Sequence, residues 1–160
     1  MNDKKIRKLV LAALLAALVC VATMVVQIPS PMQGYVNLGD CFVLLSGWLL
    51  GPWYGFAADL FLGYGHYAPG TFVIKGLVAL IAALLYEKLG RTQVSRIVGG
   101  VVSEIVMVLG YFGYASLLLG KGLAAAASIP GNVFQGTVGL VVGVLLVAVL
   151  ERAKVTEKLA

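Results

Sequence analysis

Charged residues are scarce in this chain. Only 12% of its 160 residues are Asp, Glu, Lys or Arg, whereas 61% are hydrophobic and the mean hydropathy is +0.99. A soluble domain of this length could not withdraw so much apolar surface from water. The shortage of charge therefore argues against a soluble domain and predicts a single integral membrane domain over residues 1–160.

The residues that metal and thiol chemistry require are also few. The chain has one histidine, and its two cysteines, Cys20 and Cys41, lie in or at apolar stretches without CxxC spacing. This pattern argues against a disulfide framework and against a metal site. The chain also lacks a serine elbow and a GxxxxGK[ST] phosphate loop. We therefore expect no enzyme, no metal and no cofactor of its own.

Long apolar segments are what the sequence has in abundance. Gly, Pro and charged residues divide the chain into six such segments, which predict an all-α membrane protein built as a bundle of six transmembrane helices. The second and third segments are short for a full span. Trp48 and Trp53 flank the turn between these two and are expected at the membrane interface. The expected limits are 6–26, 38–50, 53–65, 71–89, 95–119 and 130–151.

Basic residues are distributed unevenly around these segments. Of twelve, four lie before or at the start of the first segment, three lie at or between the facing ends of the fourth and fifth, and three follow the last. The positive-inside rule then places both termini in the cytoplasm. This distribution explains the net charge of +5 without a nucleic-acid partner. The basic start also resembles a signal peptide, but an apolar run of about 21 residues has the length of a membrane span.

Several ionisable and polar residues lie in or at the apolar segments. An ionisable group inside a membrane costs roughly 2.5–3.5 kcal/mol on insertion scales and usually lines a functional cavity. With the termini in the cytoplasm, most of these residues fall in the outer half, as a pocket open to the outside requires. The set comprises Asp40, Asp59, Lys75, Glu104, Tyr111, Tyr114, Asn132 and Gln135.

Helical spacing places some of these residues on common faces. Residues three, four or seven apart lie on the same side of a helix. Such faces can surround a small polar ring, with aromatic side chains to stack on it and amides or charges to bind its edges. The shared faces carry Glu104, Met107, Tyr111 and Tyr114 in one segment, Asn132 and Gln135 in another, and Thr71 and Lys75 in a third.

The same polar residues also have purely structural interpretations. Asn37 can cap a helix with Asp40 at its third position, where the helix dipole favours a carboxylate. Asp59 can pair with Lys75 inside the bundle, and Glu104 can bond to a neighbouring helix. A capping role for Asp40 and a contact with a ligand are compatible.

Small residues form a stripe on the first apolar segment. Ala12 and Ala16, with Ala13 and Ala17, make two overlapping AxxxA patterns. Small residues at this spacing let helices approach closely in lipid. The stripe therefore serves either packing within the bundle or docking onto another membrane subunit.

Five stretches together resemble the S component of an energy-coupling factor (ECF) vitamin transporter, the membrane subunit that binds the substrate. Their order and spacing carry the resemblance, which is closest to the branch of riboflavin and hydroxymethylpyrimidine transporters. The stretches are GYVNLGD (34–40), LLGPWYGFAADLFLGY (49–64), YAPGTFVIKGL (67–77), VMVLGYF (106–112) and IPGNVFQG (129–136).

The resemblance implies a transport subunit of the bacterial plasma membrane without ATPase activity. It would capture a vitamin outside and pair with a membrane T subunit and two cytoplasmic ATPases, which use ATP. It would then topple within the lipid bilayer to release its ligand inwards. The loop from about Pro29 to Asn37 would close over the ligand. By resemblance, the T subunit would contact Ala12, Ala13, Ala16 and Ala17.

The resemblance also implies a set of substrate-binding residues. Lys75, Asn132 and Gln135 stand inside well-matched stretches. The chain is short for a typical riboflavin binder, which favours hydroxymethylpyrimidine or a B6 vitamer, with riboflavin next. The full set is Tyr35, Asn37, Asp40, Lys75, Glu104, Tyr111, Asn132 and Gln135.

One alternative function remains open from the residues. A self-contained, proton-coupled carrier would use ionisable groups inside the membrane as its relay. Asp59, Lys75 and Glu104 would form that relay. Such a carrier would need no ATPase partner.

Overall fold

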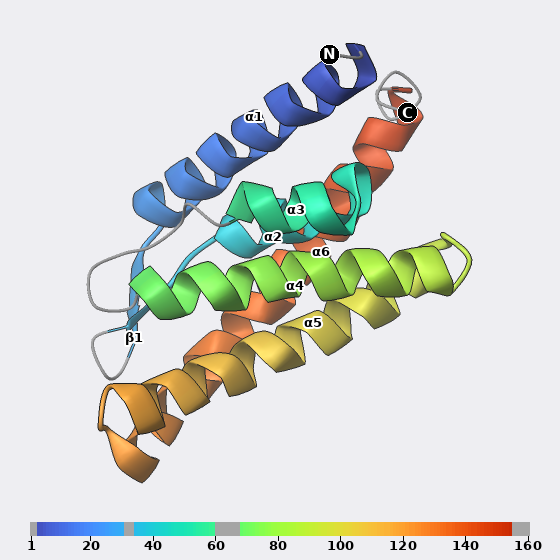
Figure 1. Ribbon diagram of the computed structural model, residues 1–160. Helices are drawn as coiled ribbons and strands as arrows, with labels where there is room; N and C mark the ends of the chain where they lie inside the picture. The colour runs from blue at the N-terminus through green and yellow to red at the C-terminus, as the bar shows by residue number, and fades with distance from the viewer. Residues whose placement is uncertain (1–2, 31–33, 60–67, 155–160) are drawn as a thin grey trace.

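A computed structural model describes residues 3–30, 34–59 and 68–154, and it is almost entirely helical (Figure 1). A π-helical turn, η3 (Tyr114–Leu118), extends α5, and a 3-10 helix, η4 (Gly122–Ser128), leads into α6. The main helices are α1 (Asp3–Val25), α2 (Gly39–Leu50), α3 (Pro52–Asp59), α4 (Ala68–Lys88), α5 (Gln93–Gly113) and α6 (Ile129–Arg152).

Four of these helical segments are long and apolar enough to cross a membrane. They are Lys5–Val25, Gly70–Lys88, Gln93–Leu118 and Gly122–Arg152. The twelve residues of α2 rise only about 18 Å, less than the roughly 30 Å of a bilayer core. The third expected segment begins in α3, and its residues 60–65 lie outside the described part of the chain.

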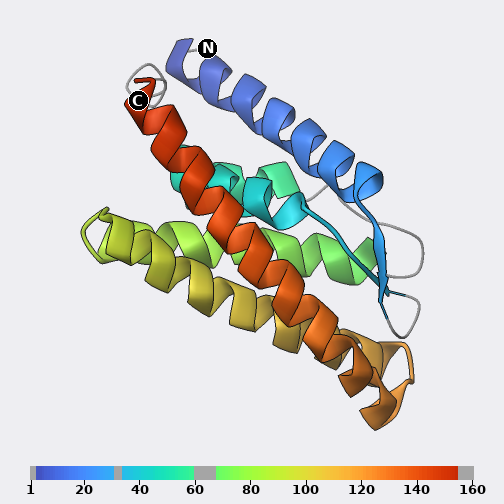
Figure 2. The same ribbon diagram turned by 180° about the vertical axis from the view of Figure 1, so that it is seen from behind.

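The expected all-α chain also contains a short β-hairpin. Strand β1 (Ile28–Ser30) pairs antiparallel with β2 (Gly34–Val36), in a register that sets Ile28 opposite Val36. The hairpin follows α1 and lies beside the start of α6 (Figure 2). It occupies the stretch in which the sequence predicts a loop that closes over a ligand.

The bundle has two distinct ends. Both termini and the turn between α4 and α5 lie at one end, which we call the terminal end (Figure 1). The hairpin, the start of α4, the end of α5 and the start of α6 lie at the other, the hairpin end. At the terminal end, Arg96 donates hydrogen bonds to Tyr86 at 2.7 Å and to Glu151 at 2.5 Å, which ties α4, α5 and α6 together.

Helix α2 forms the centre of the bundle. It packs against α1, α3, α4 and α6, and all but two of its twelve residues are buried. A helix that is apolar on every side is stable only when protein or lipid surrounds it completely. The predicted interface position is therefore wrong for Trp48, which is only 6% exposed, whereas Trp53 is 76% exposed.

Helices α2, α3 and α4 meet at Gly47 almost backbone to backbone. A Cβ atom at Gly47 would lie 2.5 Å from the carbonyl oxygen of Ala79 in α4. A Cβ atom at Gly55 in α3 would lie 2.8 Å from the Cα atom of Gly47. Because backbone atoms cannot move aside as a flexible side chain can, only glycine fits at Gly47.

The substitution Gly47→Val is expected to lower the free energy of unfolding by about 1–3 kcal/mol, because an added side chain forces α2 away from α4. Thermal unfolding of the purified protein in detergent measures this change. Gly113→Ala is the matched control, since a Cβ atom there meets nothing within 4 Å. Equal melting temperatures for the two variants would contradict the close packing described here.

Candidate functional site

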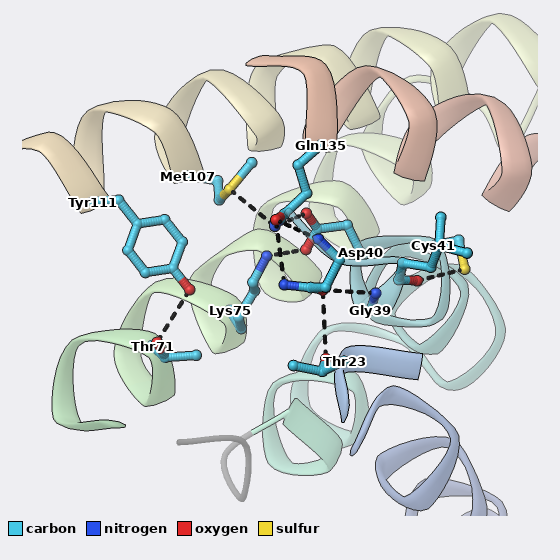
Figure 3. A network of polar contacts seen from close by, with 11 residues as sticks. Thr23, Gly39, Asp40, Cys41, Thr71, Lys75, Met107, Tyr111 and Gln135 are labelled. Carbon is cyan, nitrogen blue, oxygen red and sulfur yellow. Dashed lines mark hydrogen bonds and ion pairs between the residues drawn. The ribbon is translucent and has the colours of Figure 1, made fainter. Parts of the chain in front are cut away.

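A buried ion pair lies near the hairpin end of the bundle. Lys75 of α4 donates a hydrogen bond from Nζ to Oδ1 of Asp40, the second residue of α2 (Figure 3). Gln135 of α6 donates from Nε2 to the other carboxylate oxygen, Oδ2, at 2.7 Å. Asp40 and Gln135 are almost completely enclosed. Both carboxylate oxygens of Asp40 are thus satisfied by protein groups.

Asn37 connects this ion pair to the hairpin. Its backbone N–H and its Nδ2 group both donate to Oε1 of Gln135, at 3.0 and 3.2 Å. Its Oδ1 accepts hydrogen bonds from the backbone N–H of Gly39 at 2.8 Å and from Thr23 of α1 at 3.4 Å. The result is a continuous polar network that joins α1, α2, α4 and α6.

The start of α2 differs slightly from the sequence prediction. The helix begins at Gly39, so Leu38 occupies the N-cap position and Asp40 is the second helical residue rather than the third. Asn37 nevertheless accepts the backbone N–H of Gly39 through its side chain. The capping interaction is therefore made from one residue further outside the helix.

An aromatic side chain lies above Lys75. Tyr111 of α5 donates a hydrogen bond from its hydroxyl group to Thr71 at 3.2 Å, one turn before Lys75 in α4. The ammonium group of Lys75 is 5.6 Å from the centre of the Tyr111 ring, within reach of a cation–π attraction. Lys75 thus has an anion on one side and an aromatic face on another.

The described partner of Lys75 is Asp40. The side chain of Asp59 lies outside the described part of the structure. A buried ammonium group paired with a carboxylate is strongly held, because separating the two would leave a charge in an apolar medium. The ion pair therefore links α2 to α4, and each of its two charged groups already has a protein partner.

A groove between α5 and α6 contains the second group of polar side chains. Glu104 of α5 and Asn132 of α6 line it, and most of its remaining surface is apolar. Glu104 is 7% exposed, and neither of its carboxylate oxygens has a hydrogen-bond partner among the described residues. This arrangement differs from that of Asp40, whose two oxygens are both bonded.

The predicted substrate-binding residues therefore fall into three groups. Four of them, Asn37, Asp40, Lys75 and Gln135, make the polar network, and Tyr111 adjoins it. Glu104 and Asn132 line the groove. Tyr35 belongs to β2 and its backbone lies opposite Pro29, while its side chain lies outside the described part.

Sequence reasoning missed one member of the network, Thr23. It is the last polar residue of α1, and its hydroxyl group donates to Asn37. A lone threonine near the end of an apolar helix gave a weak signal, since its hydroxyl group can bond to its own helix backbone equally well. Only the position of the hairpin brings Asn37 within its reach.

The alanine stripe on α1 divides into an inner and an outer half. Ala12 is buried and Ala16 is partly buried, and both pack on the core that surrounds α2. Ala13 and Ala17 are exposed. In the isolated subunit, Ala13 and Ala17 are thus the exposed members of the stripe, and contact of the four alanines with a partner stays a prediction.

Three comparisons with known proteins each found a match, and two of these matches name an ECF S component. A family model described as "ECF-type riboflavin transporter, S component" matches residues 3–152. A relative from Pyrococcus woesei, named "Uncharacterized protein in gap 3'region", is 40% identical over 135 residues, covering 78% of this chain and 88% of the relative. A solved structure described as "Structure and mechanism of the S component of a bacterial ECF transporter" has a TM-score of 0.75 and 25% identity. That likeness covers 92% of this chain and 97% of the solved chain.

Proposed function

Because this chain belongs to the family of S components of ECF-type riboflavin transporters, we propose that its hairpin end binds a water-soluble vitamin, with riboflavin as the first candidate. S components are integral membrane subunits that bind a transported substrate and are not enzymes. The proposal therefore concerns which part of the chain holds the vitamin, how it faces the membrane, and which vitamin it is.

The distribution of charge supports an orientation. The terminal end carries Lys5, Lys8, Arg91, Arg96 and Arg152 among its basic residues. By the positive-inside rule this end faces the cytoplasm, so the hairpin end faces outwards. In this orientation the six helices form six membrane segments with both termini inside, and α2 and α3 cross as a pair of short helices.

One observation carries the proposed location. Buried and partly buried polar side chains from α1, α2, α4, α5 and α6 meet near the hairpin end. Burying so many polar groups is costly in a membrane protein, and they usually mark the path of a substrate. The network of Asn37, Asp40, Lys75 and Gln135 would form the floor of the pocket, with Tyr35, Tyr111, Glu104 and Asn132 around the vitamin.

The choice of vitamin changes from the one that the sequence favoured. Hydroxymethylpyrimidine and B6 vitamers came first there because the chain is short for a typical riboflavin binder. The family model that matches residues 3–152 is described as riboflavin-type. Riboflavin becomes the first candidate, and the two single-ring vitamins stay as competitors in the binding test.

The energy for transport would come from other subunits. Membership of the family implies a membrane T subunit and ATPase subunits as partners. We propose two cytoplasmic ATPases and a contact of the T subunit with the outer half of the alanine stripe, Ala13 and Ala17. ATP would then be used by the partners alone.

A binding panel tests the proposed function. The purified, folded protein is titrated with riboflavin, hydroxymethylpyrimidine, pyridoxine and, as a control, biotin. Riboflavin is expected to bind with a dissociation constant of about 1 μM or tighter, which corresponds to about 8 kcal/mol or more. Isothermal titration calorimetry gives the constant for each compound. Failure of every vitamin to bind, with the melting curve of a folded protein, would refute the proposal.

A further inference from the structure

Glu104 is a buried carboxylate that the protein itself leaves without a hydrogen bond. Its side chain belongs to the middle of α5, and both of its oxygens are enclosed without a partner among the described residues. Buried carboxylates are normally bonded or paired, because removing an unpaired charge from water is very costly. The carboxyl group of Glu104 therefore has hydrogen-bonding capacity that a group from outside the described residues can use.

Lys75 is the buried ammonium group of this region, and it is already bonded to Asp40. The hydrogen-bonding capacity of Glu104 is thus unused within the described part of the chain.

A glycine of the neighbouring helix α6 leaves the space that the Glu104 side chain occupies. A Cβ atom at Gly136 of α6 would lie 2.7 Å from Oε2 of Glu104 and 3.1 Å from its Cβ atom. The absence of a side chain at Gly136 is therefore what leaves space for the carboxylate beside α6. A larger residue there would displace the carboxylate.

The groove that contains Glu104 has the form of a site for a ring with one polar edge. Its walls are apolar, and Asn132 adds an amide that can donate and accept. Ligand sites are typically apolar concavities with a few well-placed polar groups. The other lining residues are Val101, Ile105, Val108, Leu109, Val133, Gly136, Thr137 and Leu140.

We propose that the carboxylate of Glu104 accepts a hydrogen bond from an N–H or O–H group of the bound vitamin, whose ring edge enters the groove between α5 and α6. This inference rests on the proposed function and adds the chemistry of recognition to it. The vitamin must carry a donor that can be buried. In riboflavin this donor is either the imide N–H of the ring system or a hydroxyl group of the ribityl chain.

The test is the substitution Glu104→Gln, which keeps the shape of the side chain but replaces one acceptor oxygen by a donor NH₂ group. Affinity for riboflavin is expected to fall about 10- to 100-fold, the effect of losing a hydrogen bond to a charged group. The melting temperature of the ligand-free protein is expected to change little, because the replaced group has no hydrogen-bond partner among the described residues. Glu87→Gln is the matched control, since Glu87 is exposed on α4.

Two analogues identify the donor. The compound 3-methylriboflavin lacks the imide N–H, and lumiflavin lacks the ribityl hydroxyl groups. The analogue without the relevant donor is expected to bind the wild-type protein weakly, and the Glu104→Gln substitution is expected to weaken it no further. If both analogues lose as much affinity on substitution as riboflavin does, the proposed hydrogen bond does not exist.

A second variant moves the carboxylate without removing it. Gly136→Ala is expected to weaken riboflavin binding at least as much as Glu104→Gln does, while Gly113→Ala leaves it unchanged. If the wild-type protein binds another member of the panel instead, that vitamin replaces riboflavin in the same measurements.

The outcomes separate this inference from the function on which it rests. Absence of vitamin binding by the wild-type protein overturns the proposed function and this inference together. Vitamin binding by the wild-type protein that is unchanged in Glu104→Gln overturns the inference alone. A variant that binds normally but no longer supports uptake also overturns it, and would assign Glu104 to a later step of transport.

Discussion

Replacing Lys75 with methionine is expected to lower the free energy of unfolding by about 3–5 kcal/mol, the usual cost of breaking a buried ion pair from one side. The ammonium group is the partner of Oδ1 of Asp40, and Asp40 is completely buried. Without Lys75, the carboxylate would remain in an apolar interior with Gln135 as its only described side-chain donor. Thermal and denaturant unfolding of the purified protein in detergent measure the loss.

A double substitution separates the charge from the packing. Asp40→Asn combined with Lys75→Met removes both charges while keeping similar shapes, and is expected to recover much of the lost stability. Lys88→Met serves as the surface control, since Lys88 is exposed at the terminal end. If Lys75→Met unfolds at the same temperature as Lys88→Met, the ion pair does not support the fold as described.

Ala17→Trp is expected to reduce vitamin uptake to the level of cells that lack the protein, while the purified variant binds its vitamin normally. Ala17 is exposed on α1, so a large side chain is accommodated in the subunit alone. The same side chain would prevent the close helix approach that small residues permit in membranes. Uptake is measured in cells that also express the T subunit and the ATPases, and binding is measured on the isolated protein.

Two control substitutions separate a loss of contact with the T subunit from damage to the subunit itself. Leu145→Trp adds the same ring to an exposed position of α6 and is expected to leave uptake unchanged. Ala12→Trp is expected to reduce binding and uptake together, because Ala12 packs inside the bundle. Loss of vitamin binding in Ala17→Trp would contradict the assignment of the outer alanines to a partner.

Hydropathy predicted apolar segments that overlap the long helices of the structure. The first predicted segment, 6–26, overlaps α1, and the fourth, 71–89, overlaps α4. Their limits are local properties, because Gly, Pro and charged residues interrupt an apolar run at defined positions. The hairpin escaped this reasoning, since three-residue strands are too short to show an alternating pattern and depend on pairing with each other.

Hydropathy and helical spacing could not predict which side chains from different helices contact one another. The structure pairs Lys75 with Asp40, 35 residues away, and the sequence did not predict this pairing. Trp48 was expected at the membrane interface but lies between α2 and the glycines of α5 and α6. Both outcomes depend on which helices enclose α2, and no local pattern contains that information.

The sequence by itself determined that this chain is a membrane protein and which polar residues are exceptional within it, because hydropathy and helical period are properties of neighbouring residues. Only the tertiary structure decided what each exception does. In the structure, Asp40 bonds to Lys75 and Gln135. Ala12 is buried and Ala17 is exposed. Glu104 lies beside Gly136 without a hydrogen-bond partner among the described residues. The physical reason is that a buried charge is satisfied by whichever group the crossing of the helices brings within hydrogen-bond distance, and for Gln135 and Asp40 that group lies 95 residues away.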